Sequence, residues 1–197
     1  MSNDFTWNAH VLPLVKKLTL KNNGLQKVGQ LMDFKSRKML ANGIINSQLI
    51  YCVQLFAFAS SYLLRFLQVQ QNRAARIVTR LDRSTEVSVL LQQVGWLSVK
   101  QLYVYHCLLL LFKTQRSKRP EYFISKMSRS FPYATRRSQN NSYSITGIPR
   151  TETFKRSFFQ SSINMWNNLP ADIRILMEVG EFKRKLKIWT QNSVPLL

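Results

Sequence analysis

Arginine is the residue type whose spacing in this sequence points most clearly to a chemical role, the binding of phosphate. Over residues 62–81 the arginines fall on one side of a predicted helix, because successive residues lie about 100° apart around its axis. These residues are Arg65, Arg73, Arg76 and Arg80. A guanidinium group matches two phosphate oxygens at once, so this stripe can contact successive phosphates of a nucleic acid. The alternative is an ordinary solvated helix face, with Asp82 as the acidic residue near its end.

A second basic stretch, residues 129–150, mixes arginine with aromatic residues. Arg129, Arg136 and Arg137 can neutralise backbone phosphates, and Tyr133 can stack on a base. The alternative is a disordered linker, and the sequence leaves both interpretations open.

Residues suited to catalysis or metal binding are sparse. Polymerase chemistry needs paired carboxylates that hold two metal ions. The aspartates are Asp4, Asp33, Asp82 and Asp172, and none adjoins another acidic residue. The other candidate ligands are His10, His106, Cys52 and Cys107, whose spacing does not match a zinc site. We therefore expect no catalytic residue, no metal and no cofactor, and a chain that is not an enzyme on its own.

The net charge indicates the class of partner. Lys and Arg number 29 and Asp and Glu 9, so the formal net charge is +20. A compact monomer with this imbalance repels itself, so the expected partner is a polyanion: RNA, DNA or an RNA–DNA hybrid. The alternatives are an anionic membrane surface and a reading frame whose composition reflects no function. The sequence indicates no small-molecule substrate and leaves the oligomeric state open.

The cysteines and the apolar stretches bear on the location of the protein. Cys52 and Cys107 lie in apolar surroundings and are expected to be small buried side chains in a reducing compartment. The first residues show no basic stretch followed by an apolar run, so no signal peptide is expected. Residues 43–59 are interrupted by polar side chains, and residues 102–112 fall short of the roughly twenty needed to span a bilayer. We therefore predict core helices in an intracellular protein of the cytoplasm or nucleus, without a membrane partner.

Hydrophobic periodicity predicts a mainly α fold. The helices are expected over about residues 5–33, 36–60, 62–81, 85–95, 98–114, 154–166 and 181–189. Together they suggest a basic helical bundle in residues 1–115, an irregular, flexible basic arm in 116–150 and a short helical C-terminal part in 151–197. In the last part Phe154, Phe158, Phe159 and Trp166 are expected to belong to the core, and residues 167–170 to end their helix.

Local signals set the expected helix ends. Pro13 should kink or restart the first helix, and residues 22–24 (Asn-Asn-Gly) should break it. Ser36 is the expected N-cap of the long apolar helix, and Ser84 or Thr85 that of the short helix, which should end at Gly95. Residues 98–101 (Ser-Val-Lys-Gln) fit a capping box, in which the first and last side chains bind each other's backbone N–H groups.

A series of phrases resembles the region downstream of the polymerase core in reverse transcriptases of non-LTR (LINE-type) retrotransposons. They are residues 5–11 followed by Lys16 and Lys17, then 49–52, 67–78, 95–99, 120–123, 133–136, 166–174 and 182–187. The strongest is residues 67–78 (LQVQQNRAARIV), which is similar to a "Leu-Gln-Asn-Lys/Arg-Ala-x-Arg" helix of that family. Each phrase alone has little specificity, but the series covers nearly the whole chain.

The resemblance implies a helical, thumb-like region and a tail that grip the template–primer duplex of an RNA-directed DNA polymerase, with Arg73 and Arg76 facing nucleic acid. The fingers, the palm and the Tyr/Phe-x-Asp-Asp metal motif of that family are not in this sequence. Pro13 interrupts the first helix, and residues 54–56 (Gln-Leu-Phe) stand where many relatives carry Trp-Gly. These departures suggest a truncated or decayed copy. The alternatives are an interaction protein that buries its apolar helix 43–59 against a partner or membrane, and a non-functional transposon relic.

Overall fold

The fold is mainly α, as predicted. The computed structural model describes residues 7–56, 60–125, 127–128, 143–145, 151 and 157–195. Within these residues the strands are β1 (Met127–Ser128) and β2 (Ser144–Ile145), which pair antiparallel with Met127 opposite Ile145.

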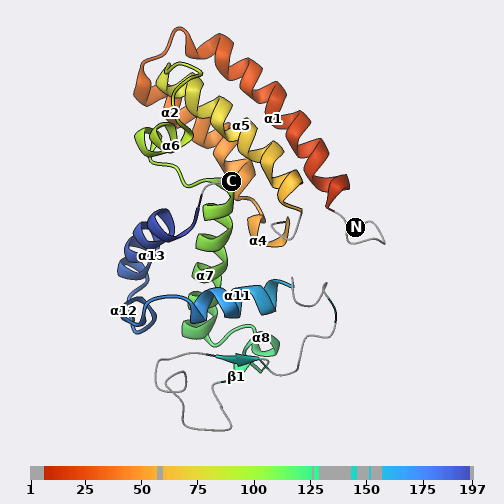
Figure 1. The fold of residues 1–197 in the computed structure, drawn as a ribbon, viewed down its shortest axis with the longest axis vertical. Coiled ribbons are helices and arrows are strands. Elements are labelled where there is room, and N and C mark those ends of the chain that lie inside the picture. Colours follow the sequence, from red (N-terminus) through yellow and green to blue (C-terminus); the bar gives the residue numbers. More distant parts are fainter. Residues whose placement is uncertain are drawn as a thin grey trace. The chain divides into compact units, whose positions relative to one another are not determined.

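The chain divides into two compact units. The described residues of Met1–Tyr103 and Val194–Leu197 form the first unit, and those of Val104–Ser193 form the second. The division falls inside one helix, α7 (Val99–Ser117), whereas the sequence suggested boundaries at residues 115 and 150. Figure 1 shows the course of the chain through both units.

The first helix, α1 (Asn8–Gly29), runs without the predicted break. It continues through Pro13, and the buried residues Val11, Leu18 and Leu25 recur along it at seven-residue intervals. The prediction of a break at residues 22–24 was wrong because the amide of Asn22 has a tertiary partner. Its Nδ2 donates to the backbone oxygen and to Oε1 of Gln70, at 3.1 and 3.2 Å, instead of competing with the helix backbone.

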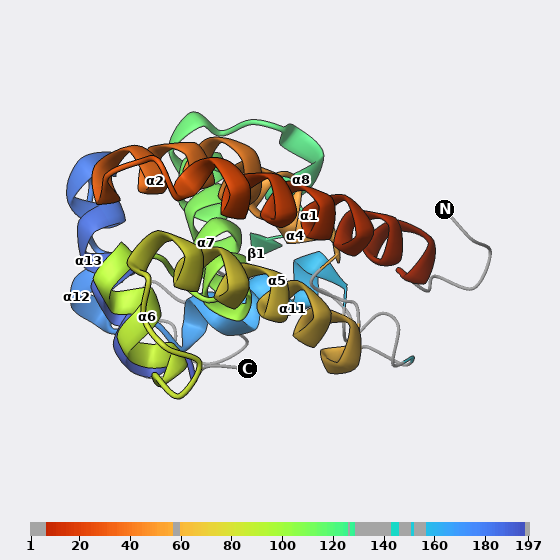
Figure 2. The same cartoon turned by 90° about the horizontal axis from the view of Figure 1, so that it is seen from above.

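Helix α5 (Ser61–Thr79) lies along α1 and runs in the same direction (Figures 1 and 2). Asn22 contacts Gln70, and further along both helices the carbonyl of Gln30 accepts a hydrogen bond from Arg80. The segment between these helices runs the opposite way. The first unit is therefore built on three consecutive passes of the chain, each antiparallel to the one before it.

The returning pass consists of short pieces rather than the single helix predicted over 36–60. They are α2 (Phe34–Ala41), the π-helical turn η1 (Asn42–Asn46), α3 (Ser47–Ile50) and α4 (Val53–Phe56). The break follows α3, where Cys52 adopts a positive φ of 53°. Asp33, not Ser36, is the N-cap of α2: its Oδ1 accepts from the N–H of Ser36 at 3.2 Å. Hydrogen bonds from the side chain and then the backbone of Ser36 lower the pKa of the Asp33 carboxyl.

The apolar side of this returning pass belongs to the core of the first unit. Ile45, Leu49 and Val53 are buried, and Tyr51 and Leu55 are exposed. Ile45, Leu49 and Val53, which the alternative interpretation assigned to a partner or membrane, are thus covered by the chain's own helices.

Two buried glutamines of α5 bind the backbone at the start of α7. Gln71 Nε2 donates to the carbonyl of Leu97 at 2.8 Å, and Gln68 Oε1 accepts from the N–H of Val99 at 2.8 Å. Gln68 also donates to Gln71 Oε1 at 3.0 Å, so the buried polar atoms satisfy one another. The burial of these two glutamines was not predicted, because the backbone groups that they bind lie far away in the sequence.

Local signals fix the next two helix ends. Helix α6 (Val87–Val94) stops at Gly95, which has a φ of 70°, as predicted. Its N-cap is Glu86, without a side-chain cap bond, so the assignment of Ser84 or Thr85 was wrong. The predicted capping box at the start of α7 is confirmed: Ser98 Oγ accepts from the N–H of Gln101 at 3.2 Å, and Gln101 Oε1 accepts from the N–H of Ser98 at 3.0 Å.

Replacing Gly95 with alanine is expected to lower the free energy of unfolding by about 1 kcal/mol, because a Cβ is disfavoured at positive φ. Gly24→Ala is the matched control. Gly24 lies inside α1, and a Cβ there would have no neighbour within 4 Å, so this change is expected to stabilise by about 0.5–1 kcal/mol. Urea unfolding of both variants checks the prediction, and equal shifts in the same direction would contradict it.

The second unit contains α8 (Glu121–Ser125), α11 (Phe158–Asn167), α12 (Ala171–Arg174) and α13 (Val179–Ser193), besides most of α7. Its aromatic core is formed by Phe112, Trp166 and Phe182. The rings of Phe112 and Phe182 stack with centroids 3.9 Å apart, and Trp166 lies 6.1 Å from Phe182. The burial of Trp166 was predicted and is confirmed.

The remaining predictions for this unit had mixed outcomes. The helix end at residues 167–170 is confirmed, Phe158 and Phe159 are half-buried, and Phe154 lies outside the described residues. Helix α13 is longer than the predicted 181–189, and α12 was not predicted. Within residues 116–150, predicted as an irregular arm, α7 extends to Ser117 and α8, β1 and β2 follow.

Candidate nucleic-acid interface

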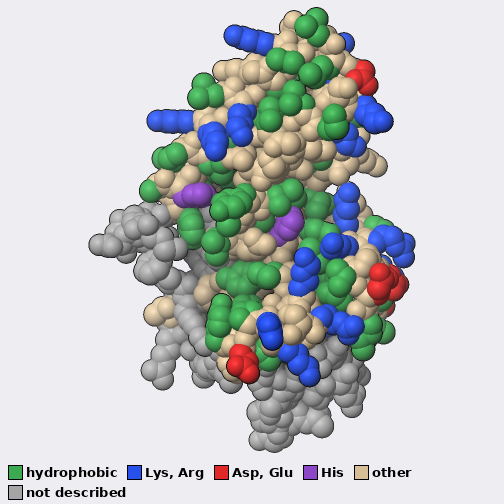
Figure 3. Space-filling view, turned by 180° about the vertical axis from the view of Figure 1, so that it is seen from behind, with side chains coloured by type: hydrophobic (Ala, Val, Ile, Leu, Met, Phe, Trp, Pro, Cys, Tyr) green, Lys and Arg blue, Asp and Glu red, His purple; other side chains and the backbone are tan. Residues whose placement is uncertain are grey.

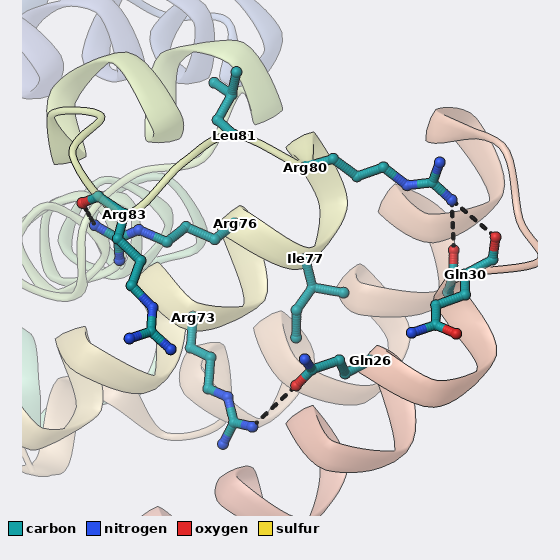
Figure 4. Close-up of a pocket in the computed structure, with 9 residues that line it drawn as sticks. Gln26, Gln30, Arg73, Arg76, Ile77, Arg80, Leu81 and Arg83 are labelled. Atoms are coloured by element: carbon teal, nitrogen blue, oxygen red, sulfur yellow. Dashed lines mark hydrogen bonds between the residues drawn. The ribbon is translucent and has the colours of Figure 1, made fainter.

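The C-terminal halves of α1 and α5, together with the loop after α5, line a cavity of about 430 Å³, which we name the arginine pocket (Figure 4). Its basic residues are Arg73, Arg76, Arg80 and Arg83. Its other lining residues are Gln26, Gly29, Gln30, Ile77 and Leu81. Three of the four arginines predicted from the helical stripe are thus brought together, and all lie within the first unit.

Arg73 projects from α5 towards α1. Its Nη2 donates to Asn23 Oδ1 at 2.7 Å and to Gln26 Oε1 at 3.2 Å. Both partners are neutral amides, so these bonds fix the position of the guanidinium without pairing it with a carboxylate.

Arg80 makes contacts that its place in the stripe did not predict. It ends α5 in the left-handed conformation, with a φ of 61°. Its Nη2 donates to the carbonyls of Gln30 and Gly29, at 2.9 and 3.3 Å, which lie at the C-terminal end of α1. The positive charge offsets the negative end of the helix dipole and caps carbonyls that lack helical partners.

Arg76 and Arg83 form the side of the pocket opposite α1. Arg76 Nη2 donates weakly to the carbonyl of Arg83 at 3.5 Å, and its Nε is buried without a hydrogen-bond partner among the described residues. In Figure 4 the side chains of Arg73 and Arg83 extend in the same direction. Sequence reasoning missed Arg83 because it lies in the loop after the helix, where a helical projection does not apply. The nearby sequence Arg-Leu-Asp-Arg was its only signal.

The pocket carries positive charge without a carboxylate partner. No acidic residue lines it, and none of its four arginines forms an ion pair within the described part of the chain. In the described residues an ion pair is formed outside the pocket, between Lys185 and Glu181 of α13 at 3.5 Å. Uncompensated guanidinium groups around a recess attract anions, and phosphate in particular.

Arg37 does not line the pocket, but it joins two of the elements that form it. It is buried, at 5% exposure, and its Nε donates to the carbonyl of Val78 at 2.9 Å while Nη1 donates to the carbonyl of Met32 at 2.5 Å. Burial lowers the pKa of Arg37, and the nearby charge of Arg80 lowers it further, while Asp33 acts in the opposite direction. Arg37 thus ties the end of α5 to the turn after α1, the two elements that hold the pocket arginines.

The other predicted binding residues lie elsewhere. Arg65 is exposed on α5 but does not line the pocket. Arg129, Tyr133, Arg136 and Arg137 lie outside the described residues. Beyond the pocket, Lys and Arg side chains are spread over the face drawn in Figure 3, on which the coloured residues include few Asp or Glu.

The described residues also include histidines, cysteines and apolar helices outside the pocket. They contain no group of three or more His, Cys, Asp or Glu side chains that could hold a metal ion. Cys107 is buried and Cys52 half-buried, and neither forms a disulfide. Burial, and next to it the charge of Lys113, lowers the pKa of His106. Of the described helices none alone is long and apolar enough to cross a membrane; α6 and α7 meet that test of length and composition only as a pair bent by 49°.

Two of the phrases that carry the retrotransposon resemblance contact each other. Gln68 and Gln71, in residues 67–78, bind the backbone of Val99 and Leu97, in residues 95–99. The polar residues of the strongest phrase therefore have a structural role beside any role in binding. Comparisons of the chain with protein-family models, with curated proteins and with solved structures gave no match.

Proposed function

We propose that this protein binds nucleic acid and that the arginine pocket holds phosphate of the bound strand. The observation that carries the proposal is that four arginines line one recess and no carboxylate does. Guanidinium groups pair with phosphate oxygens through charge-assisted hydrogen bonds, which are about twice as strong as neutral ones. The net charge of +20 favours the same class of partner.

The phosphate contacts are assigned to Arg73, Arg76 and Arg83. The partners of Arg73 are side-chain amides, and that of Arg76 is a backbone carbonyl at 3.5 Å, so a phosphate can be added or exchanged at little cost. Arg80 is committed to the end of α1 and acts chiefly on stability.

The resemblance to non-LTR reverse transcriptases extends this proposal to a specific partner. A thumb-like fragment of an RNA-directed DNA polymerase would hold the backbone of a template–primer duplex and would have no polymerase activity of its own. An RNA–DNA hybrid is therefore the proposed preferred ligand, ahead of duplex DNA and single-stranded RNA.

The test is a salt titration of binding to these three ligands, measured by fluorescence anisotropy. The logarithm of the affinity should fall linearly with the logarithm of the salt concentration, with a slope of about −0.7 to −0.9 per phosphate contact. A steep slope with tightest binding to the hybrid supports the proposal. Absence of binding at low salt contradicts nucleic-acid binding, and equal affinity for all three ligands contradicts only the template–primer assignment.

Arg73→Ala and Arg83→Ala are each expected to weaken binding about tenfold and to reduce the salt slope by about one contact. Arg73→Lys keeps the charge but loses the planar fork, so it should fall between wild type and Arg73→Ala. Arg184→Ala is the control, because it removes the same charge from an exposed position of α13. If Arg184→Ala weakens binding as much as the pocket variants, the charge acts diffusely and the pocket is not the site.

A further inference from the structure

We infer that the arginine pocket takes the terminal phosphate of a nucleic-acid strand, in preference to a phosphodiester within the strand. This inference rests on the proposed nucleic-acid binding and concerns the same site. It assigns a strand end, bearing a phosphate monoester, as the ligand.

The first argument is the number and placement of the donors. The side chains of Arg73 on α5 and Arg83 in the loop after it extend in the same direction (Figure 4). Arg76, also on α5, lines the same recess and has a buried Nε without a partner among the described residues. A phosphodiester offers two non-bridging oxygens and one negative charge. A phosphate monoester offers three such oxygens and about −1.5 to −2 charges at neutral pH. Three guanidinium groups around one recess match the monoester better in both respects.

The second argument is the shape of the site. A duplex backbone is contacted along a continuous surface, where side chains reach successive phosphates. Here the arginines line a recess of about 430 Å³, a volume in the range of about 300–1,000 Å³ that is usual for small-ligand pockets. A recess of this size can hold a terminal phosphate together with the nucleotide that bears it.

The third argument is what lies beside the arginines. Ile77 and Leu81 supply apolar surface, and the amides of Gln26 and Gln30 supply hydrogen-bonding groups. A bare inorganic anion has no use for apolar surface, whereas the sugar and base of a terminal nucleotide do. The left-handed conformation of Arg80 turns the chain after α5, and Leu81 and Arg83 then line the same recess as α5 and α1.

The experiment uses the whole chain and one RNA–DNA hybrid of fixed sequence with an internal fluorescent label. The DNA strand carries a 5′-phosphate, a 3′-phosphate or hydroxyl groups at both ends. We expect about tenfold tighter binding of one phosphorylated form than of the hydroxyl form, because the monoester adds charge-assisted contacts. In Arg83→Ala this preference should shrink to less than about threefold, whereas Arg184→Ala should keep it.

The outcomes separate the two proposals. Equal affinity for all three forms, together with a steep salt slope, overturns the terminal-phosphate site and leaves nucleic-acid binding intact. Absence of binding to any form overturns both. The comparison of ligands on the unmodified protein needs no variant, so a folding defect in Arg83→Ala does not remove the test. A preference that persists unchanged in a folded Arg83→Ala overturns the assignment to this pocket.

Discussion

Replacing Trp166 with alanine is expected to lower the free energy of unfolding by about 3–5 kcal/mol, the usual cost of removing a large aromatic side chain from a core. Trp166 is fully buried, at 0% exposure, and its ring lies 6.1 Å from Phe182 and 6.2 Å from Tyr143. The cavity left behind is bounded by helices and by the residue pair Tyr143–Asn167, whose two hydrogen bonds of 2.9 Å limit its collapse. Urea unfolding followed by far-UV circular dichroism gives the change.

Two further variants make this prediction specific. Trp166→Phe keeps most of the apolar volume and should recover more than half of the loss. Ile188→Ala on α13 alters a side chain that is 50% exposed, and it should change the free energy of unfolding by less than about 1 kcal/mol. A Trp166→Ala variant as stable as Ile188→Ala would show that this residue does not belong to a packed core.

Replacing Arg37 with methionine is expected to cost about 2–4 kcal/mol of unfolding free energy. Methionine keeps the alkyl part of the side chain but removes the donors to the carbonyls of Val78 and Met32. The penalty arises because buried carbonyls then lack partners, which is costlier than losing an exposed hydrogen bond. The same unfolding assay measures it.

Lys35→Met is the matched control, because Lys35 lies on the same helix and is exposed. It removes one positive charge and adds the same side chain, and it should change the free energy of unfolding by less than about 0.5 kcal/mol. Equal stability of the two variants would contradict the capping role of Arg37. Arg37→Lys separates charge from geometry, because lysine keeps the charge but cannot reach two carbonyls with a planar fork.

The parts of the fold that the sequence predicted are those with local causes. Gly95 ends α6 because its own backbone adopts a positive φ, and Ser98 and Gln101 start α7 through bonds made within one turn. The parts that it mispredicted have distant causes. Asn22 stays helical because Gln70 binds its side chain, and such a partner is invisible to a window of neighbouring residues.

The candidate site shows the same limit. The helical spacing of Arg73, Arg76 and Arg80 placed them on one side of α5, and they line one pocket. The spacing contained no information on α1, so it could not distinguish Arg80, which binds the end of that helix, from Arg73, which binds side-chain amides. Arg83 joins the pocket through a turn of the backbone at Arg80, which no periodicity encodes.

The division of the chain gives the second unit the topology of an inserted domain. The chain leaves the first unit after Tyr103 and re-enters it at Val194. Gln101 Nε2 donates to the carbonyl of Val194 at 3.0 Å, so the residues that flank the insertion are neighbours. A single proteolytic cut within residues 104–193 therefore cannot release the first unit as one continuous peptide. Limited proteolysis would separate the units only after two cuts, one near Tyr103 and one near Val194.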